Sequence, residues 1–186
     1  MQTIESNTNI GAQSIDGVSY GQAHKTNVGL GLDDLLKLDA ASLDQLYRNA
    51  SVPSLSAVRG DLRGRMLSVL GPLRMPLSPL SALASSDWFP WRGKTFDPAD
   101  EQHGFGINRV FTDRLKLFRF ATSIGPSKAG PFDALQLDYD LPENPWFIRR
   151  IEDEIRELSP GLWLGQAYFR TRAAAHLVLF FGLAAR

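Results

Sequence analysis

Residues 115–140, LKLFRFATSIGPSKAGPFDALQLDYD, give the clearest indication of which fold to expect. They contain two apolar runs, Leu115–Ile124 and Phe132–Asp140, separated by the segment Gly-Pro-Ser-Lys-Ala-Gly. Short runs rich in aromatic and aliphatic side chains are typical of strands, and a cluster of glycine, proline and serine between them is typical of a turn. The stretch therefore predicts an antiparallel hairpin.

Similar short runs occur on both sides of this hairpin, and a turn at residues 60–65 is expected to lead into a further short strand at 66–70. Strands at such spacing are typical of a meander sheet that curls into a barrel. We therefore expect an α+β protein that is mainly β, namely an antiparallel lipocalin-like β-barrel with short N-terminal helices. The main expected strands are Gly93–Phe96, Gly106–Phe111, Leu115–Ile124, Phe132–Asp140, Leu162–Arg170 and His176–Leu183.

The N-terminal part has a different character. Residues 1–31 are rich in Gly, Ser, Asn, Gln and Thr and poor in large apolar groups, so a flexible tail is expected there. Leucines at helical spacing then predict one or two short helices that end near Asn49, with Ser42 and Gln45 at the spacing of a capping box. Residues 32–186 are expected to form one helix-plus-barrel domain.

The segment from Pro145 to Leu158 allows two interpretations. Its apolar residues have helical spacing, and Asn144 and Pro145 suit the start of a helix. Alternatively, a short helix ends near Ile151, and a strand at 154–158 pairs with the next strand across Ser-Pro-Gly. The sequence does not decide between them.

Composition excludes several classes of function. The chain has 20 Lys and Arg, 20 Asp and Glu and no Cys, so neither nucleic-acid binding nor thiolate chemistry is expected. No signal peptide and no membrane-spanning apolar run is recognisable, which favours a cytoplasmic protein. No cofactor motif is recognisable, and no cofactor is expected. The sequence leaves the oligomeric state open, and a homo-oligomer is compatible with it.

The order of several short motifs resembles a known group of proteins. Trp91-Arg92-Gly93-Lys94 is followed by Leu137-Asp138-Tyr139-Asp140, then by Leu164-Gly165 and the terminal run 179–183. This order resembles small bacterial lipocalin-like barrels of the Gly-x-Trp-x-Gly type, which are mostly uncharacterised. The first glycine of that motif is replaced by Phe89. The resemblance implies a barrel around an apolar cavity, and it carries no catalytic residues and no haem ligand with it.

Alternation in the strand 132–140 raises the question of which face points inward. Tyr139 shares a face with Leu135 and Leu137, whereas Asp138 lies on the opposite face. A leucine face turned toward the interior would place Tyr139 inside and Asp138 in solvent, and a polar interior would do the reverse. The first arrangement is favoured because a partly exposed sheet buries its leucine face. A metal site at the aspartates is not predicted.

Other charged residues allow both a structural and a chemical interpretation. Lys116 or Arg119 is expected on a largely apolar face, where an arginine would need a carboxylate such as Asp138, Asp153 or Glu154. A structural ion pair is favoured over the gripping of a ligand anion. In a strand, Glu154 and Arg156 would share one face, and one of them could act as an acid or base in the cavity. The candidate catalytic residues are Arg119, Asp138, Tyr139, Glu154 and Arg156.

Aromatic residues are numerous for a chain of this size. They suit either a filled core or the lining of an apolar pocket. The candidate ligand-binding residues are Trp91, Lys94, Phe118, Phe120, Trp163, Tyr168 and Phe180.

We therefore expect a protein that binds a small hydrophobic molecule in a barrel cavity. A cofactor-independent isomerase, lyase or cyclase is favoured over a non-catalytic carrier, although the residues do not decide whether the protein is an enzyme at all. An accessory protein that acts through contacts with a partner is the third alternative.

Overall fold

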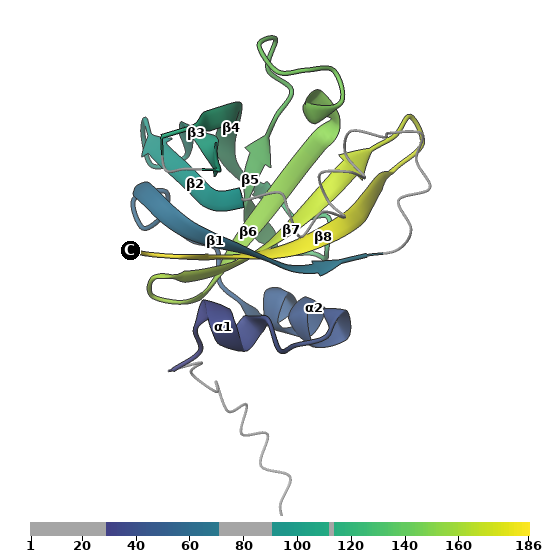
Figure 1. The fold of residues 1–186 in the computed structure, drawn as a ribbon. Helices are drawn as coiled ribbons and strands as arrows, with labels where there is room; N and C mark the ends of the chain where they lie inside the picture. The colour runs from purple at the N-terminus through teal and green to yellow at the C-terminus, as the bar shows by residue number, and fades with distance from the viewer. Residues whose placement is uncertain (1–28, 71–90, 112–113) are drawn as a thin grey trace, which may run out of the picture.

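A computed structural model describes residues 29–70, 91–111 and 114–186. Two α-helices, α1 (Leu32–Leu35) and α2 (Ala40–Asn49), precede a closed barrel of antiparallel strands in the order in which they occur along the chain (Figure 1). The prediction of an antiparallel barrel with short N-terminal helices is confirmed. The strands are β1 (Gly60–Val69), β2 (Trp91–Pro98), β3 (His103–Val110), β4 (Lys116–Pro126), β5 (Asp133–Asp138), β6 (Ile151–Ser159), β7 (Leu162–Arg170) and β8 (Ala175–Ala184).

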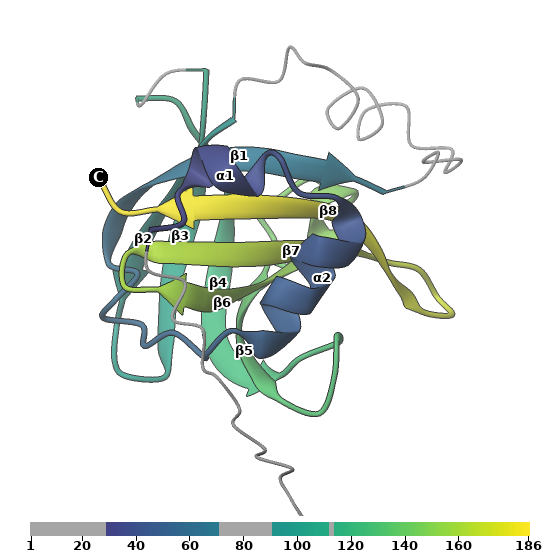
Figure 2. The same cartoon turned by 90° about the horizontal axis from the view of Figure 1, so that it is seen from below.

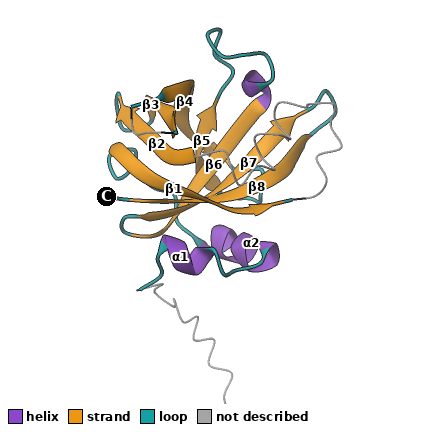
Figure 3. Ribbon diagram, viewed as in Figure 1, coloured by secondary structure: helices purple, strands orange, loops and turns teal. Residues whose placement is uncertain are grey.

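Each strand pairs with the next, and β8 closes the barrel by pairing with β1 through partners such as Gly182 and Arg65. The predicted hairpin is present as β4 and β5, where Ile124 lies opposite Leu135. Figure 3 shows how little of the described chain is helical. Residues 1–28, most of the expected tail, lie outside the described residues.

In the structure the segment 145–158 is a short helical turn followed by a strand, which is the second of the two interpretations. Residues Ile148–Arg150 form one turn of 3-10 helix, and Ile151–Ser159 form β6. Helical spacing was misleading here because Ile151 and Ile155 also satisfy the two-residue period of a strand. β6 has neighbours on both sides, and these pairings satisfy its backbone.

Two further expectations are corrected in the N-terminal half. Asp39, rather than Ser42, caps α2, since its side chain accepts a hydrogen bond from the Ser42 amide. Residues 60–65 belong to the long strand β1 and are not a turn. The glycines Gly60 and Gly64 suggested a turn, but Gly64 lies in the strand, where the ring of Trp91 and the backbone of Gly93 occupy the space of a Cβ.

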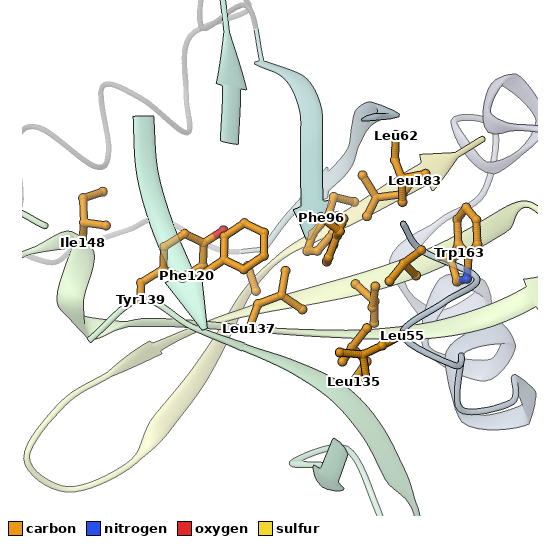
Figure 4. Close-up of a cluster of buried hydrophobic side chains, with 14 residues drawn as sticks. Leu55, Leu62, Phe96, Phe120, Leu135, Leu137, Tyr139, Ile148, Trp163 and Leu183 are labelled. Atoms are coloured by element: carbon orange, nitrogen blue, oxygen red, sulfur yellow. The ribbon is translucent and has the colours of Figure 1, made fainter. Parts of the chain in front are cut away.

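The buried apolar residues form two separate clusters. The interior cluster lies inside the barrel and includes Leu62, Phe120, Leu137, Trp163 and Phe181 (Figure 4). The helix-facing cluster includes Leu35, Leu43, Tyr47, Leu164 and Phe180. Figure 2 shows α1 and α2 across the outer surface of β6, β7 and β8, so the parts of these strands beneath the helices are covered on both faces.

Candidate functional site

A buried lysine occupies the centre of a polar network inside the barrel. The Nζ atom of Lys94 donates hydrogen bonds to Asp153 Oδ2 (2.8 Å), Asn108 Oδ1 (2.9 Å) and the hydroxyl of Tyr139 (2.5 Å). An ammonium group has three protons, and these three acceptors use all of them. Lys94 and Asp153 therefore form an ion pair that is almost completely shielded from solvent.

Strand pairing explains why these residues meet. Lys94 on β2 lies opposite Asn108 on β3, and Asp153 on β6 lies opposite Leu137 on β5. Opposed residues of an antiparallel pair point to the same face, so the members of each pair share the barrel interior. Tyr139 follows β5 two residues after Leu137, and its hydroxyl donates to Asp153 Oδ2 over 3.1 Å.

Asn108 links the network to the strand β4 and to Trp91. Its Nδ2 donates to the Tyr139 hydroxyl (3.0 Å) and to the carbonyl of Phe118 (3.3 Å), and its Oδ1 accepts from Trp91 Nε1 (3.1 Å). The pairing of β3 with β4 is irregular at this position, since Ile107 lies opposite Arg119 while Asn108 lies opposite Leu117. Phe118 is the extra residue of a β-bulge, and its φ of 59° lies in the left-handed region.

Four aromatic rings surround the ammonium group of Lys94. Its Nζ lies 5.1–5.4 Å from the ring centroids of Trp91, Phe120, Tyr139 and Phe181. Such distances allow cation–π attraction, which strengthens where water is excluded. Two of the rings can approach the barrel wall because Gly106 and Gly165 have no Cβ. A Cβ at Gly106 would lie 2.3 Å from the ring of Phe120, and one at Gly165 would lie 2.2 Å from the ring of Phe181.

Burial changes the proton affinities of two network members. Burial lowers the pKa of Lys94, although the charge and hydrogen bond of Asp153 oppose this effect. Burial also raises the pKa of Tyr139 well above its usual value, and the Asp153 carboxylate adds to the effect. Tyr139 therefore remains a proton donor across the ordinary pH range, and perturbed groups of this kind are frequent at functional sites.

The network leaves one of its atoms unused. Asp153 Oδ1 is buried and has no hydrogen-bond partner among the residues that the structure describes. Oδ2 of the same carboxylate receives both Lys94 and Tyr139. A buried acceptor without a partner is costly, and it suggests that another molecule supplies a donor.

The structure brings about half of the predicted site residues together in the barrel interior. Tyr139, Lys94 and Trp91 belong to the polar network, and Phe120 contributes a ring next to it. Phe118 packs against the interior cluster, and Trp163 is a buried member of it. The leucine face of β5 lies inside, as the alternation predicts, because Leu135, Leu137 and Tyr139 are all buried.

Four predicted residues lie on the other side of the barrel wall. Glu154 and Tyr168 are buried on the outer face near α2, where the Glu154 carboxylate accepts from Tyr47, Ser127 and Lys128. Arg156 donates to the carbonyls of Ala50 and Asp133. Phe180 belongs to the helix-facing cluster. These four residues hold the helices and the β4–β5 turn to the barrel.

Two predicted catalytic residues are exposed. Asp138 accepts a hydrogen bond from the amide of Asp140 and lies in solvent. Arg119 is also exposed, with its side chain 3.7 Å from Glu143 and stacked on Phe105. The expectation that Lys116 or Arg119 lies on an apolar face is wrong, since both are exposed. The bulge at Phe118 shifts the alternation by one residue, which sequence alternation alone did not indicate.

The sequence patterns predicted no site role for two members of the network. Asp153 was considered only as the partner of a buried arginine, and Asn108 was not considered. One signal for Asp153 was present in the sequence, because a strand at 151–159 places Asp153 and Ile155 on one face and Glu154 on the other. No signal connected Asn108 to Lys94 before the pairing of β2 with β3 was known.

No group of three or more His, Asp or Glu side chains that could hold a metal ion occurs within residues 29–70, 91–111 and 114–186. Neither α1 nor α2 is long and apolar enough to cross a bilayer.

Comparisons with known proteins give little further guidance. No protein-family model matches the chain, and no curated protein matches it. One solved structure, described as the crystal structure of a protein from Thermomonospora curvata, is similar with a TM-score of 0.48 and 16% sequence identity. The similarity covers 80% of this chain and 88% of that chain.

Proposed function

We propose that the barrel interior binds a small apolar molecule and that Asp153 moves a proton on it without a cofactor. The unpaired Asp153 Oδ1, in a network whose other polar atoms are paired, is the observation that carries this proposal. The aromatic and aliphatic side chains of the interior cluster would surround the apolar part of the molecule. The motif resemblance to lipocalin-like barrels of the Gly-x-Trp-x-Gly type agrees with this role.

Asp153 has the surroundings of a general base. Lys94 and Tyr139 hold its Oδ2 and fix the direction of the carboxylate, so Oδ1 is free to take a proton from the ligand. When Asp153 takes a proton from a carbon of the ligand, the electron pair of the broken C–H bond stays on the ligand, and the ammonium of Lys94 compensates this negative charge. Asp153 then returns the proton to another atom of the ligand. The same total charge is present before and after the transfer, which keeps the step inexpensive in an interior with little water.

A non-catalytic carrier is the second candidate. It is favoured by the fact that all three protons of Lys94 already have acceptors, which is also the arrangement of a purely structural ion pair. A carrier would use the same interior and the same unpaired oxygen to hold its ligand, but no proton would move.

The experiment starts from the natively purified protein. Native mass spectrometry identifies a retained small molecule, which is then extracted and incubated in heavy water with wild-type protein, Asp153→Asn and Glu154→Gln. We expect wild type and Glu154→Gln to incorporate deuterium at a carbon of the ligand, whereas Asp153→Asn binds it without exchange at carbon. Tyr139→Phe, which keeps the ion pair, is expected to exchange more slowly.

The outcomes separate the alternatives. Binding without exchange by every protein would show a carrier. Failure of the wild-type interior to bind any apolar molecule would overturn both candidates. Equal loss of exchange in Glu154→Gln and Asp153→Asn would show that the effect is not specific to the interior carboxylate.

A further inference from the structure

The barrel interior contains a second unpaired polar atom. Trp163 is almost fully buried in the interior cluster, and its Nε1 has no hydrogen-bond partner among the described residues. This atom is a donor, whereas Asp153 Oδ1 is an acceptor. A buried indole N–H usually finds a partner, so the interior presents two complementary unsatisfied groups.

These groups lie toward opposite ends of the barrel. Asp153 is opposite Ala167 on β7, and Trp163 precedes Ala167 by four residues on that strand. At about 3.3 Å per residue, the two positions are separated by roughly 13 Å along the strand. Figure 4 shows Tyr139, whose hydroxyl donates to Asp153, and Trp163 on opposite sides of Leu137.

The interior between these two groups is lined by apolar side chains. Leu135, Leu137 and Ile155 are fully buried and belong to the interior cluster. They come from β5 and β6, and Leu135 lies opposite Ile155. A molecule that reached both polar groups would therefore need an apolar body between two polar ends.

The charges of the network restrict which polar group of a ligand can bind next to Asp153. A carboxylate oxygen accepts a proton donor and repels an anion, and Lys94 has no proton left to offer. A free fatty acid would bring its own carboxylate against Asp153, which is unfavourable in an interior with little water. A hydroxyl group is neutral and donates, so it suits this position.

We propose that the ligand is an elongated apolar molecule with a hydroxyl group at one end and a neutral acceptor oxygen at the other. The hydroxyl donates to Asp153 Oδ1, and the acceptor oxygen receives the N–H of Trp163. This inference rests on the proposed binding function and adds the chemical class of the ligand. Ordered water could satisfy each atom separately, and the experiment separates this case from ligand binding.

The test uses four biphenyl probes with the wild-type protein and therefore does not depend on the folding of any variant. Biphenyl has neither polar end, para-hydroxybiphenyl has the donor, para-methoxybiphenyl has the acceptor, and the para-hydroxy-para′-methoxy compound has both. Isothermal titration calorimetry measures the affinity of each. We expect each polar end to increase affinity about tenfold, and the hydroxyl more than the methoxy group because its acceptor is charged.

Two variants assign the effects to the two residues. Trp163→Phe keeps an aromatic ring but removes the N–H, so it should abolish the gain from the methoxy group and leave the gain from the hydroxyl. Asp153→Asn should do the reverse. Glu154→Gln, on the outer face, is the matched control and should change neither gain.

The results distinguish failure of the inference from failure of the proposed function. If biphenyl binds as tightly as the compound with both polar ends, the interior binds apolar molecules but the hydroxyl and acceptor assignment is wrong, and water satisfies the two atoms. Palmitate is titrated in the same way, and an affinity above that of both hydroxylated biphenyls would also overturn the assignment. If none of the probes binds wild type, both the assignment and the proposed binding function are overturned.

Discussion

Asp153 and Glu154 are neighbours on β6, and both are buried, yet they belong to different environments. Glu154 faces the helices, where Ser127, Tyr47 and the backbone and side chain of Lys128 donate to its two oxygens. Asp153 faces the interior, where Oδ2 receives two donors and Oδ1 receives none from the described residues. The Glu154 carboxylate joins parts of the fold, whereas the Asp153 carboxylate keeps one oxygen that accepts no hydrogen bond from the described residues.

The strongest predicted effect is on the free energy of unfolding when the lysine of either network is replaced. Lys94→Met leaves Asp153 buried without a cation, so the free energy of unfolding should fall by about 3–5 kcal/mol in urea denaturation. Lys128→Met is the matched change on the outer face. Its cost should be about 1 kcal/mol, since Lys128 is partly exposed and Glu154 keeps its other donors.

A double variant sharpens this result. Lys94→Met combined with Asp153→Leu removes both charges, and most of the stability should return because no unpaired charge remains buried. Equal costs for Lys94→Met and Lys128→Met would contradict the distinction between the two networks.

An intermediate effect is expected from the close approach of an aromatic ring to the barrel wall. The added Cβ of Gly165→Ala would lie 2.2 Å from the ring of Phe181, which must then move away from Lys94. We expect a loss of about 1–3 kcal/mol, measured by urea denaturation. In Gly31→Ala, next to α1, the nearest atom would be 3.8 Å away, and this control should change stability little. A Gly165→Ala protein as stable as the control would show that the ring has room to move.

The smallest effect concerns alkaline pH, where the two networks should behave alike. Burial is the main cause that raises the pKa of Tyr139 in the interior and the pKa of Tyr47 beneath the helices. Above the usual tyrosine pKa of about 10, the unfolded chain loses these protons while the folded chain keeps them. The folded state then binds more protons, so stability falls as pH rises.

At one pH unit above the usual tyrosine pKa, Tyr139→Phe and Tyr47→Phe should each reduce the loss of unfolding free energy by about 1 kcal/mol. The lowered pKa of Lys94 acts in the opposite direction, but only up to the unfolded lysine pKa of about 10.4. Thermal unfolding across this range measures the slopes. An unchanged slope in Tyr139→Phe would mean that the interior hydroxyl ionises normally.

Sequence patterns predicted much of the barrel because strand alternation and turn chemistry are local. The β4–β5 hairpin could be predicted from its Gly-Pro turn, and the leucine face of β5 from alternation. The bulge at Phe118 could not be predicted in this way, because it arises from the pairing of β4 with β3. The sequence of β4 contains no residue pattern that indicates it. Its consequence was the wrong placement of Lys116 and Arg119.

The candidate site was only partly predictable for a related reason. The sequence patterns predicted site roles for Lys94, Trp91 and Tyr139. They predicted none for Asn108 and Asp153, which accept or donate the hydrogen bonds of these residues. Interactions across a barrel depend on strands that are distant in the chain. The contact between Lys94 and Asp153 spans 59 positions, and no local pattern contains it.

Local sequence patterns account for the antiparallel strands, the short helices and the alternation that separates Tyr139 from Asp138, since these features depend on neighbouring residues. The pairing of distant strands is needed to establish which carboxylate of β6 meets the buried lysine and which meets the helices. Closure of the barrel turns Asp153 and Lys94 toward a common interior, and the docking of α2 covers Glu154 from outside. Two adjacent residues of similar chemistry thereby acquire different roles.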